Sequence, residues 1–339
     1  MKKITTIGID LAKNVFHLHG VDEHGKVVLR KKLMRDQVLP FLATLSPCLI
    51  GMEACGGSNY WARKIKELGH DARLINPKFV KAYVKSNKND YNDAEGICEA
   101  VSRPSMRFVP IKTVDQLDMQ ALHRVRSQLI KERTGIVNQV RGLLGEFGIV
   151  IPKGIEYARK NLPDILEDQT NELTEFGLKL FRDLYERLIE LDDRISKMDQ
   201  EIKTLFNADE TCQRIHALEG VGPLIATAII AMVGNFNEFK NGRDLSAWLG
   251  LVPRQHSTGG KELLLGISKR GNRYLRTMLI HGARSVVYRA AKKDDPKSRW
   301  INALKARRGE NVACVAVANK NARIIWALIT NGTEYQKAV

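Results

Sequence analysis

The stretch ITTIGIDLAKNVFHLHGVDEHGKVVLRKKL, residues 4–33, decides how the N-terminal part of the chain folds. It holds three runs rich in Val, Ile, Leu and Phe that are bounded by polar turn residues, which is the pattern of β-strands. The runs cover residues 4–10, 15–21 and 26–33. Because only the short turn Asp22-Glu23-His24-Gly25 separates the last two, we expect the strands to follow one another as a meander.

Strands and helices alternate after this meander. Residues 48–53 and 72–76 predict a fourth and a fifth strand, and residues 59–68 between them predict a helix. Three strands in a meander followed by alternating strands and helices are typical of an α/β domain of the ribonuclease-H-like kind. The sequence therefore predicts an α/β fold class for the N-terminal part.

The composition is that of a folded and strongly basic protein. Among 339 residues there are 54 Lys and Arg against 38 Asp and Glu, a formal net charge of +16, and 44% of the residues are hydrophobic. That apolar share excludes a disordered chain. The charge excess favours a polyanionic partner, because it attracts phosphates over a long range, although a basic solvated surface is the simpler alternative.

Membrane insertion and secretion are not expected. No run reaches the roughly 18 apolar residues of a membrane span, and the N-terminus resembles a strand more than a signal peptide. The five cysteines are scattered without paired CxxC spacing, so they predict neither a disulfide framework nor a zinc site. We expect a cytoplasmic protein without a membrane partner.

The charge is unevenly distributed along the chain. Residues 254–308 contain 15 Lys and Arg and three acids, a net of +12. Residues 164–210 contain 14 acids and six bases, a net of −8. Such segmentation is expected when one part of a protein faces nucleic acid and another part does not.

The acidic segment carries a heptad pattern of apolar residues. They step by four and three residues and comprise Leu184, Leu188, Leu191, Ile195, Met198, Ile202 and Leu205. This spacing predicts a long helix in a coiled coil. Residues 115–147 show helical spacing as well and are its expected partner, within one chain or across a dimer, with Pro152 and Pro163 bracketing the connection.

Four carboxylates are candidates for a metal site. Asp10 ends the first predicted strand and Glu53 the fourth, so both can converge at the carboxyl edge of a sheet. Asp90 and Asp93 are three residues apart, which places them on one face of a helical turn. Four such acids repel one another unless a divalent cation neutralises them, and oxygen ligands suit Mg²⁺ or Mn²⁺ in phosphoryl transfer. The simpler alternative is that each acid is a turn, cap or surface residue.

The segments around these acids resemble the DEDD motif of the transposases of the insertion-sequence one-ten family, and the whole chain is most similar to its eleven-eleven subgroup. The resemblance rests on residues 8–13, 52–57 and 88–94. It implies a RuvC-like domain in which Asp10, Glu53, Asp90 and Asp93 bind Mg²⁺.

A glycine turn precedes the basic segment. Gly220 and Gly222 stand in LEGVGPLIA, residues 218–226, ahead of an apolar helix. Two glycines allow a tight turn, and backbone N–H groups at a helix start can hold a phosphate, as in a helix-hairpin-helix. An ordinary turn between two helices is the alternative.

Ser257 is the candidate nucleophile. It lies in a glycine-flanked loop of the segment 248–276, which resembles the C-terminal transposase (Tnp) domain of the same family. The resemblance implies that the serine before paired glycines joins covalently to a DNA end, and Ser257 matches that position. The neighbouring Thr258 is the other hydroxyl there, and its bulkier side chain makes it the poorer choice.

Several cations around this loop are candidates for phosphate contacts. They are Arg254, Lys261, Lys269, Arg270, Arg273 and Arg276. Arg270 and Arg273 are expected to share one face of a helix, because they are three residues apart. The alternative for the group is a solvated basic face.

These observations combine into an expected organisation and function. We expect a RuvC-like domain over residues 1–112, a helical coiled-coil region over 113–210 and a mainly helical Tnp domain with a helix-hairpin-helix over 211–332. The resemblance implies a transposase that cleaves and rejoins donor and target DNA, guided by a non-coding bridge RNA, as a homodimer or homotetramer. It also implies a bacterial protein that is associated with the nucleoid. The alternatives are a Piv-type DNA invertase, a RuvC-like nuclease without a guide, and a non-enzymatic nucleic-acid scaffold.

Overall fold

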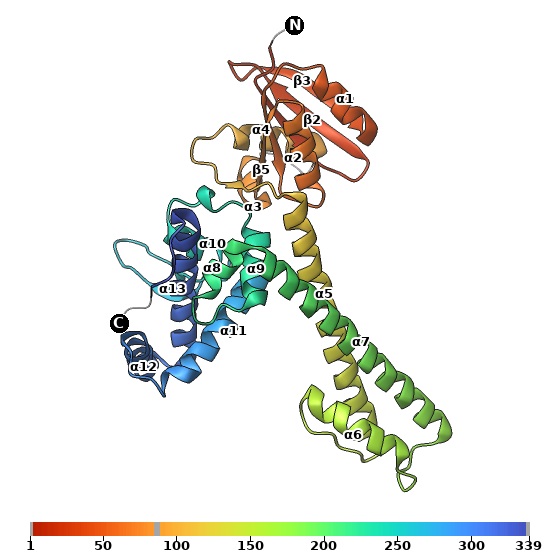
Figure 1. The fold of residues 1–339 in the computed structure, drawn as a ribbon. Coiled ribbons are helices and arrows are strands. Elements are labelled where there is room, and N and C mark those ends of the chain that lie inside the picture. The colour runs from red at the N-terminus through yellow and green to blue at the C-terminus, as the bar shows by residue number, and fades with distance from the viewer. Residues whose placement is uncertain (1–2, 85–88, 337–339) are drawn as a thin grey trace. The chain divides into compact units, whose positions relative to one another are not determined.

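The structure is a computed structural model that describes residues 3–84 and 89–336 (Figure 1). The chain divides into two compact units. The first comprises Met1–Val114 together with Val233–Glu238, and the second Asp115–Met232 together with Phe239–Val339. The first unit is a mixed α/β sheet domain, and the second is mostly helical.

A six-stranded sheet forms the centre of the first unit, in the order β3-β2-β1-β4-β5-β6. Strands β1, β2 and β3 pair antiparallel, β4 and β5 run parallel to β1, and β6 is antiparallel to β5. The strands are β1 (Thr6–Asp10), β2 (Val15–Val21), β3 (Val27–Met34), β4 (Leu49–Glu53), β5 (Asp71–Ile75) and β6 (Phe108–Val109). The five strands predicted from the sequence are thus confirmed within two residues, and the two-residue β6 is additional.

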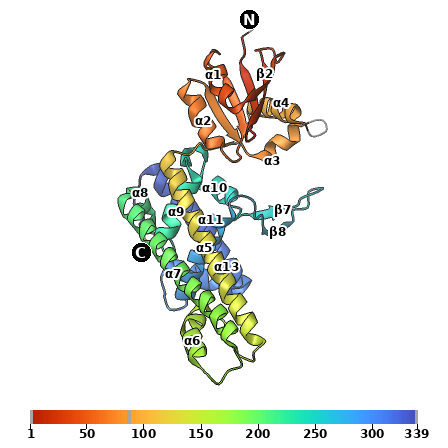
Figure 2. The same cartoon turned by 90° about the vertical axis from the view of Figure 1, so that its right-hand side faces the viewer.

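Helices cover both faces of this sheet (Figure 2). On one face, Ile7 and Ile9 of β1 belong to a buried cluster that includes Trp61 and Ile65. On the other face, helix α4 packs against β1, β2 and β4. The helices of the unit are α1 (Val38–Ala43), α2 (Ser58–Glu67), α3 (Pro77–Val80) and α4 (Asp90–Val101). Since successive strand residues point to opposite faces, Gly8 and Asp10 lie on the α4 side of β1.

Three helices at the start of the second unit share one buried apolar cluster. They are α5 (Val114–Gly145), α6 (Ile155–Glu167) and α7 (Glu175–Ala208), and α5 and α7 lie side by side (Figures 1 and 2). The heptad residues Leu184, Leu188 and Leu191 of α7 are buried as expected, and they meet α5 of the same chain. Pro152 and Pro163 were expected to bracket the connection between these two long helices. The connection itself contains α6, and Pro163 lies inside that helix.

The remaining helices of the second unit surround α13 (Glu310–Asn331), which packs against α11, α10 and α12. The other elements are α8 (Glu210–His216), α9 (Pro223–Val233), α10 (Gly242–Trp248), β7 (Pro253–Gln255), β8 (Leu264–Ile267), α11 (Arg273–Ala290) and α12 (Pro296–Arg308). Among the described residues, α13 alone is long and apolar enough to cross a membrane by length and composition. Its buried side chains, Val317 and Ile325 among them, make it a core helix of this unit.

Candidate active site

Two of the four predicted carboxylates end neighbouring strands. Asp10 is the last residue of β1 and Glu53 the last residue of β4, and these strands pair in parallel up to Ile9 and Met52. Their carboxyl ends therefore meet at the same edge of the sheet. Both side chains are half-buried, so the edge is open to solvent without being fully exposed.

Helix α4 brings two further carboxylates to this edge. The side chain of Asn89 caps the helix by accepting a hydrogen bond from the backbone N–H of Tyr91 at 3.0 Å. Asp90 and Asp93 consequently stand in the first turn of α4. One carboxylate oxygen from each of Asp10, Asp90 and Asp93 lies within 4.8 Å of the others. The sheet and the helix thus bring these three acids together.

Glu53 lies close enough to the other acids for their charges to change its pKa. Burial raises the pKa of the Glu53 carboxyl, and the negative charges of Asp10 and Asp93 raise it further. An arrangement in which like charges disfavour ionisation is relieved by a divalent cation, and carboxylate oxygens are the donors that such hard cations take. The donor set therefore fits a divalent metal ion.

Sequence reasoning missed a fifth side chain at this edge, that of His17. It stands on β2 directly opposite Asp10 in the antiparallel register, and its Nδ1 lies 3.7 Å from Oδ2 of Asp90. The signal was present in the alternation of the second predicted strand. It becomes informative only once the pairing of β1 with β2 is known.

Ser257 lies in the second unit, in the loop of the hairpin formed by β7 and β8 (Figure 2). Its side chain is exposed, and its Oγ accepts a hydrogen bond from Nε2 of Gln255 at 2.9 Å. Thr258 is also exposed, but its backbone pairs with Lys261 to close the turn. The loop therefore presents two hydroxyls to solvent, and the backbone of Thr258 is the more constrained.

The cations near this loop differ in their accessibility. Arg254, Lys261, Lys269, Arg270 and Arg273 are exposed. Arg270 and Arg273 do not share a helical face as expected, because α11 begins only at Arg273 and Arg270 lies in the preceding loop.

Arg276 departs from its predicted role as a phosphate contact. Its side chain is buried, and its guanidinium donates to the backbone carbonyls of Leu249 at 3.1 Å and Arg270 at 3.2 Å. Burial lowers the pKa of Arg276, and the charge of Arg273 lowers it further. Because its Nη1 donates to both carbonyls within the fold, Arg276 holds the loop before α11 in place.

The glycine turn lies between α8 and α9, as expected. Gly220 has a φ of +87° and packs so closely on α11 that a Cβ there would lie 2.8 Å from the carbonyl oxygen of Gly282. A Cβ on Gly222 would meet no atom within 4 Å. Packing therefore explains Gly220, whereas Gly222 leaves open space beside the turn.

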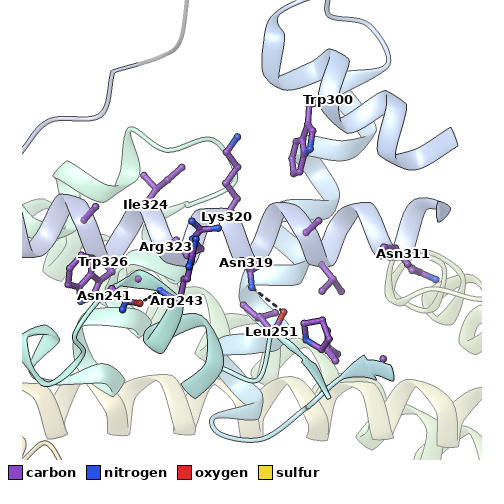
Figure 3. A pocket seen from close by; sticks show the side chains of 18 of the residues that line it. Asn241, Arg243, Leu251, Trp300, Asn311, Asn319, Lys320, Arg323, Ile324 and Trp326 are labelled. Atoms are coloured by element: carbon purple, nitrogen blue, oxygen red, sulfur yellow. Dashed lines mark hydrogen bonds between the residues drawn. The ribbon is translucent and has the colours of Figure 1, made fainter. Parts of the chain in front are cut away.

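A groove of 1220 Å³ runs between α13, α10 and the base of the hairpin (Figure 3). Its walls are largely apolar, and Nζ of Lys320 lies 4.9 Å from the ring centroid of Trp300. Arg243, Lys320 and Arg323 are its exposed cations, and no acid lines it among the residues that the structure describes. The groove thus has a positive rim next to the strands that carry the Ser257 loop.

Two transposase family models match the chain. Residues 7–149 match the family model for IS110-type DEDD transposases, whose description is simply "transposase". Residues 212–299 match the model described as the transposase IS116/IS110/IS902 family. The first match spans all four carboxylates, and the second spans Ser257.

Curated relatives cover nearly the whole chain. A probable family 20 transposase of Pseudomonas aeruginosa is 51% identical over 334 residues, which cover 98% of this chain and 99% of the relative. The transposase for insertion sequence element IS1111A of Coxiella burnetii is 49% identical over 99% of this chain and 92% of its own. The transposase for insertion sequence element IS1328 of Yersinia enterocolitica is 44% identical over 99% of this chain and 100% of its own.

The family matches agree with the geometry of the carboxylates. DEDD transposases act on DNA and use a divalent metal ion, and the chain brings acids together that fit one. The relatives at 44% to 51% identity carry the names of transposases, and the matches cover 92% to 100% of their lengths. The chain is therefore a transposase, and it belongs to the IS116/IS110/IS902 family of DEDD transposases.

Proposed function

We propose that the chain cleaves and rejoins the DNA of an insertion sequence, with Asp10, Glu53, Asp90 and Asp93 as ligands of Mg²⁺ and with Ser257 as the nucleophile. The observation that carries the proposal is the convergence of Asp10, Asp90 and Asp93 within 4.8 Å at the edge where β4 delivers Glu53. When bound, a divalent ion supplies positive charge that offsets the carboxylates and stabilises charge on the phosphate.

The sheet topology supports a RuvC-like, ribonuclease-H-like domain. Its first three strands form an antiparallel meander, and β4 and β5 continue from β1 in parallel. Asp10 and Glu53 end the two adjacent parallel strands β1 and β4. The tight turn at Gly220 between α8 and α9 supports in the same way a helix-hairpin-helix, with Gly222 beside the phosphate.

Ser257 is proposed to form the covalent link. Its Oγ bonds to phosphorus while its proton passes to water. The bond from phosphorus to one strand oxygen breaks, and that oxygen takes up a proton and leaves as the hydroxyl of the free strand end. The phosphoserine keeps the DNA end attached until another strand oxygen displaces the serine. Exposure of the hydroxyl on a hairpin loop, with Arg254 and Lys261 beside it, supports this role.

Nucleic acid is proposed to lie along the basic part of the second unit. The exposed cations Lys269, Arg270 and Arg273 continue from the hairpin, and the groove adds Lys320 and Arg323. A bridge RNA that pairs with donor and target DNA is proposed as a further partner, together with assembly into a homodimer or homotetramer. The net charge of +16 supports the binding of more than one polyanion.

Replacement of Ser257 by Ala tests the nucleophile. We expect Ser257→Ala to abolish the covalent protein–DNA adduct and strand cleavage, and Thr258→Ala to retain both. Adducts are measured on denaturing gels with labelled donor DNA and Mg²⁺. Full cleavage by Ser257→Ala, combined with its loss in Asp93→Asn, would instead identify a RuvC-like nuclease.

The guide is tested separately from the chemistry. We expect a discrete RNA to co-purify with the protein and recombination to stop when that RNA is digested. Recombination by RNA-free protein would identify a Piv-type invertase.

A further inference from the structure

His17 is a buried residue beside the four carboxylates, and the proposed chemistry gives it no role. Strand β2 places it opposite Asp10, and because paired residues of neighbouring strands point to the same face, both side chains lie on the α4 side of the sheet. His17 is only 7% exposed. Asp90, which starts α4, approaches it from the adjoining helix.

The Nδ1 atom of His17 is buried and has no hydrogen-bond partner in the described part of the chain. A buried polar atom without a hydrogen-bond partner destabilises the folded state, so its presence needs a reason. Oδ2 of Asp90 lies 3.7 Å from this Nδ1, which is too long for a hydrogen bond. A small movement of the exposed Asp90 carboxylate closes that distance.

The imidazole ring is the fixed partner of this pair. The ring of Tyr91 packs edge-on against it with centroids 4.6 Å apart, and the guanidinium of Arg30 lies over Tyr91 at 5.1 Å. Strand β2 and the first turn of α4 therefore hold the ring from two sides. Asp90 is exposed and is free to adjust its side chain toward the ring.

We propose that His17 is a positioning residue whose Nδ1–H donates a hydrogen bond to Oδ2 of Asp90 and so holds that carboxylate in the orientation that binds the divalent cation. The inference rests on the proposed metal site. Hydrogen bonds to a ligand carboxylate orient it and raise metal affinity, and their loss costs 10- to 100-fold in general. Here the donor has to be the Nδ1–H tautomer, since an unprotonated Nδ1 repels the carboxylate oxygen.

His19 provides a matched control on the same strand and the same face. It is 4% exposed, and its Nδ1 is likewise without a partner in the described part of the chain. Burial lowers the pKa of His19, and the charges of Glu95 and Arg30 also act on that pKa. Neither residue belongs to the proposed metal site. Substitution of His19 therefore disturbs a similar buried site without touching Asp90.

The experiment measures Mn²⁺ affinity of the full-length protein, without DNA, by electron paramagnetic resonance of free Mn²⁺ during titration with MnCl₂. The variants are His17→Ala, His17→Asn, His17→Gln and His19→Asn. The amide nitrogen of Asn occupies nearly the position of Nδ1, whereas that of Gln occupies nearly the position of Nε2. We expect the Mn²⁺ dissociation constant to rise about 10- to 100-fold in His17→Ala and His17→Gln. In His17→Asn and His19→Asn it should stay near the wild-type value.

The outcomes separate this inference from the metal site on which it rests. Wild-type affinity in His17→Ala, with affinity lost in Asp93→Asn, overturns the role of His17 and leaves the metal site standing. Equal weakening in His17→Asn and His17→Gln also overturns it, because the ring would then act only by packing. Equal Mn²⁺ binding by wild type and Asp93→Asn overturns the metal site and the inference together. Circular dichroism of metal-free variants identifies any that fail to fold.

Discussion

Gly8 determines how closely α4 approaches the sheet. A Cβ at this position would lie 2.2 Å from the carbonyl oxygen of Ala94 and 2.3 Å from the backbone nitrogen of Cys98. Both are backbone atoms of α4 and do not yield as a flexible side chain does. The close packing at Gly8 therefore fixes the distance from Asp10 on β1 to Asp90 and Asp93 on α4.

Gly8→Ala is predicted to weaken metal binding as well as stability. The added methyl group pushes α4 away from β1, at a cost of roughly 1–3 kcal/mol in the free energy of unfolding. Titration with Mn²⁺ and urea unfolding measure the two effects. Gly142→Ala in α5 is the control, because a Cβ there meets no atom within 4 Å, and it should stabilise by about 0.5–1 kcal/mol. Unchanged Mn²⁺ affinity in Gly8→Ala would contradict the argument.

His123 is a fully buried histidine in the second unit. Its Nε2 lies 3.0 Å from Oγ1 of Thr227 on α9, and its Nδ1 lies 3.1 Å from the hydroxyl of Tyr274 on α11. Burial, together with the smaller effect of the nearby charge of Arg126, lowers the pKa of His123 to about 4. The native state thus keeps this imidazole neutral.

The second unit should therefore lose stability in mild acid. As pH falls from about 6.5 to about 4, His123 becomes protonated in the unfolded chain but stays largely neutral in the folded chain. The free energy of unfolding therefore decreases. The loss approaches about 3 kcal/mol for this one group. Urea unfolding across this pH range measures it, and His123→Gln should flatten the dependence. An equally steep dependence in His123→Gln would assign it to other groups.

At the scale of elements, the sequence predicted what depends on local periodicity. The strands around Asp10 and Glu53 emerge from their apolar runs, and the buried seam of α7 emerges from its heptads. The hairpin of β7 and β8 was not predicted, because its exposed strands carry no apolar alternation. The role of Arg276 was misjudged and His17 was missed. Both depend on contacts with residues distant in sequence, and periodicity carries no information about such contacts.

Asp192 joins the three helices α5, α6 and α7. It accepts hydrogen bonds from Arg133 of α5 at 2.8 Å and from Arg159 of α6 at 2.5 Å. Burial alone would raise the pKa of Asp192, but the hydrogen bonds from Arg159 and Arg133 outweigh it and hold the pKa below its usual value. The carboxylate therefore stays charged and fixes α6 onto the helix pair.

Asp192→Asn is predicted to loosen α6. The loss of charge-assisted hydrogen bonds should lower the free energy of unfolding by about 1–3 kcal/mol and speed amide hydrogen exchange in α6. Glu190→Gln is the control, since Glu190 pairs with Arg194 at 3.7 Å on the exposed face of α7, and such pairs contribute about 0–1 kcal/mol. Similar losses in both variants would show that Asp192 has no special role.

At the scale of the whole molecule, the location of the charge matters more than its total. The segment 254–308 has a net charge of +12, and it contains the Ser257 hairpin with exposed Lys261. The segment 164–210 has a net charge of −8 and includes all of α7, where Lys203 is exposed. The same change of one charge can therefore be made in a basic and in an acidic setting.

Lys261→Ala and Lys203→Ala should differ in DNA binding although both reduce the net charge by one. A lysine that contacts phosphate releases about 0.9 counterion on binding, so Lys261→Ala should make the slope of log K against log salt shallower by about that amount. Lys203→Ala should leave the slope unchanged, because an acidic helix repels the phosphates. Fluorescence anisotropy of labelled donor DNA at several salt concentrations measures both slopes. If the two variants change it equally, DNA responds to the net charge of +16 and not to a basic surface around Ser257.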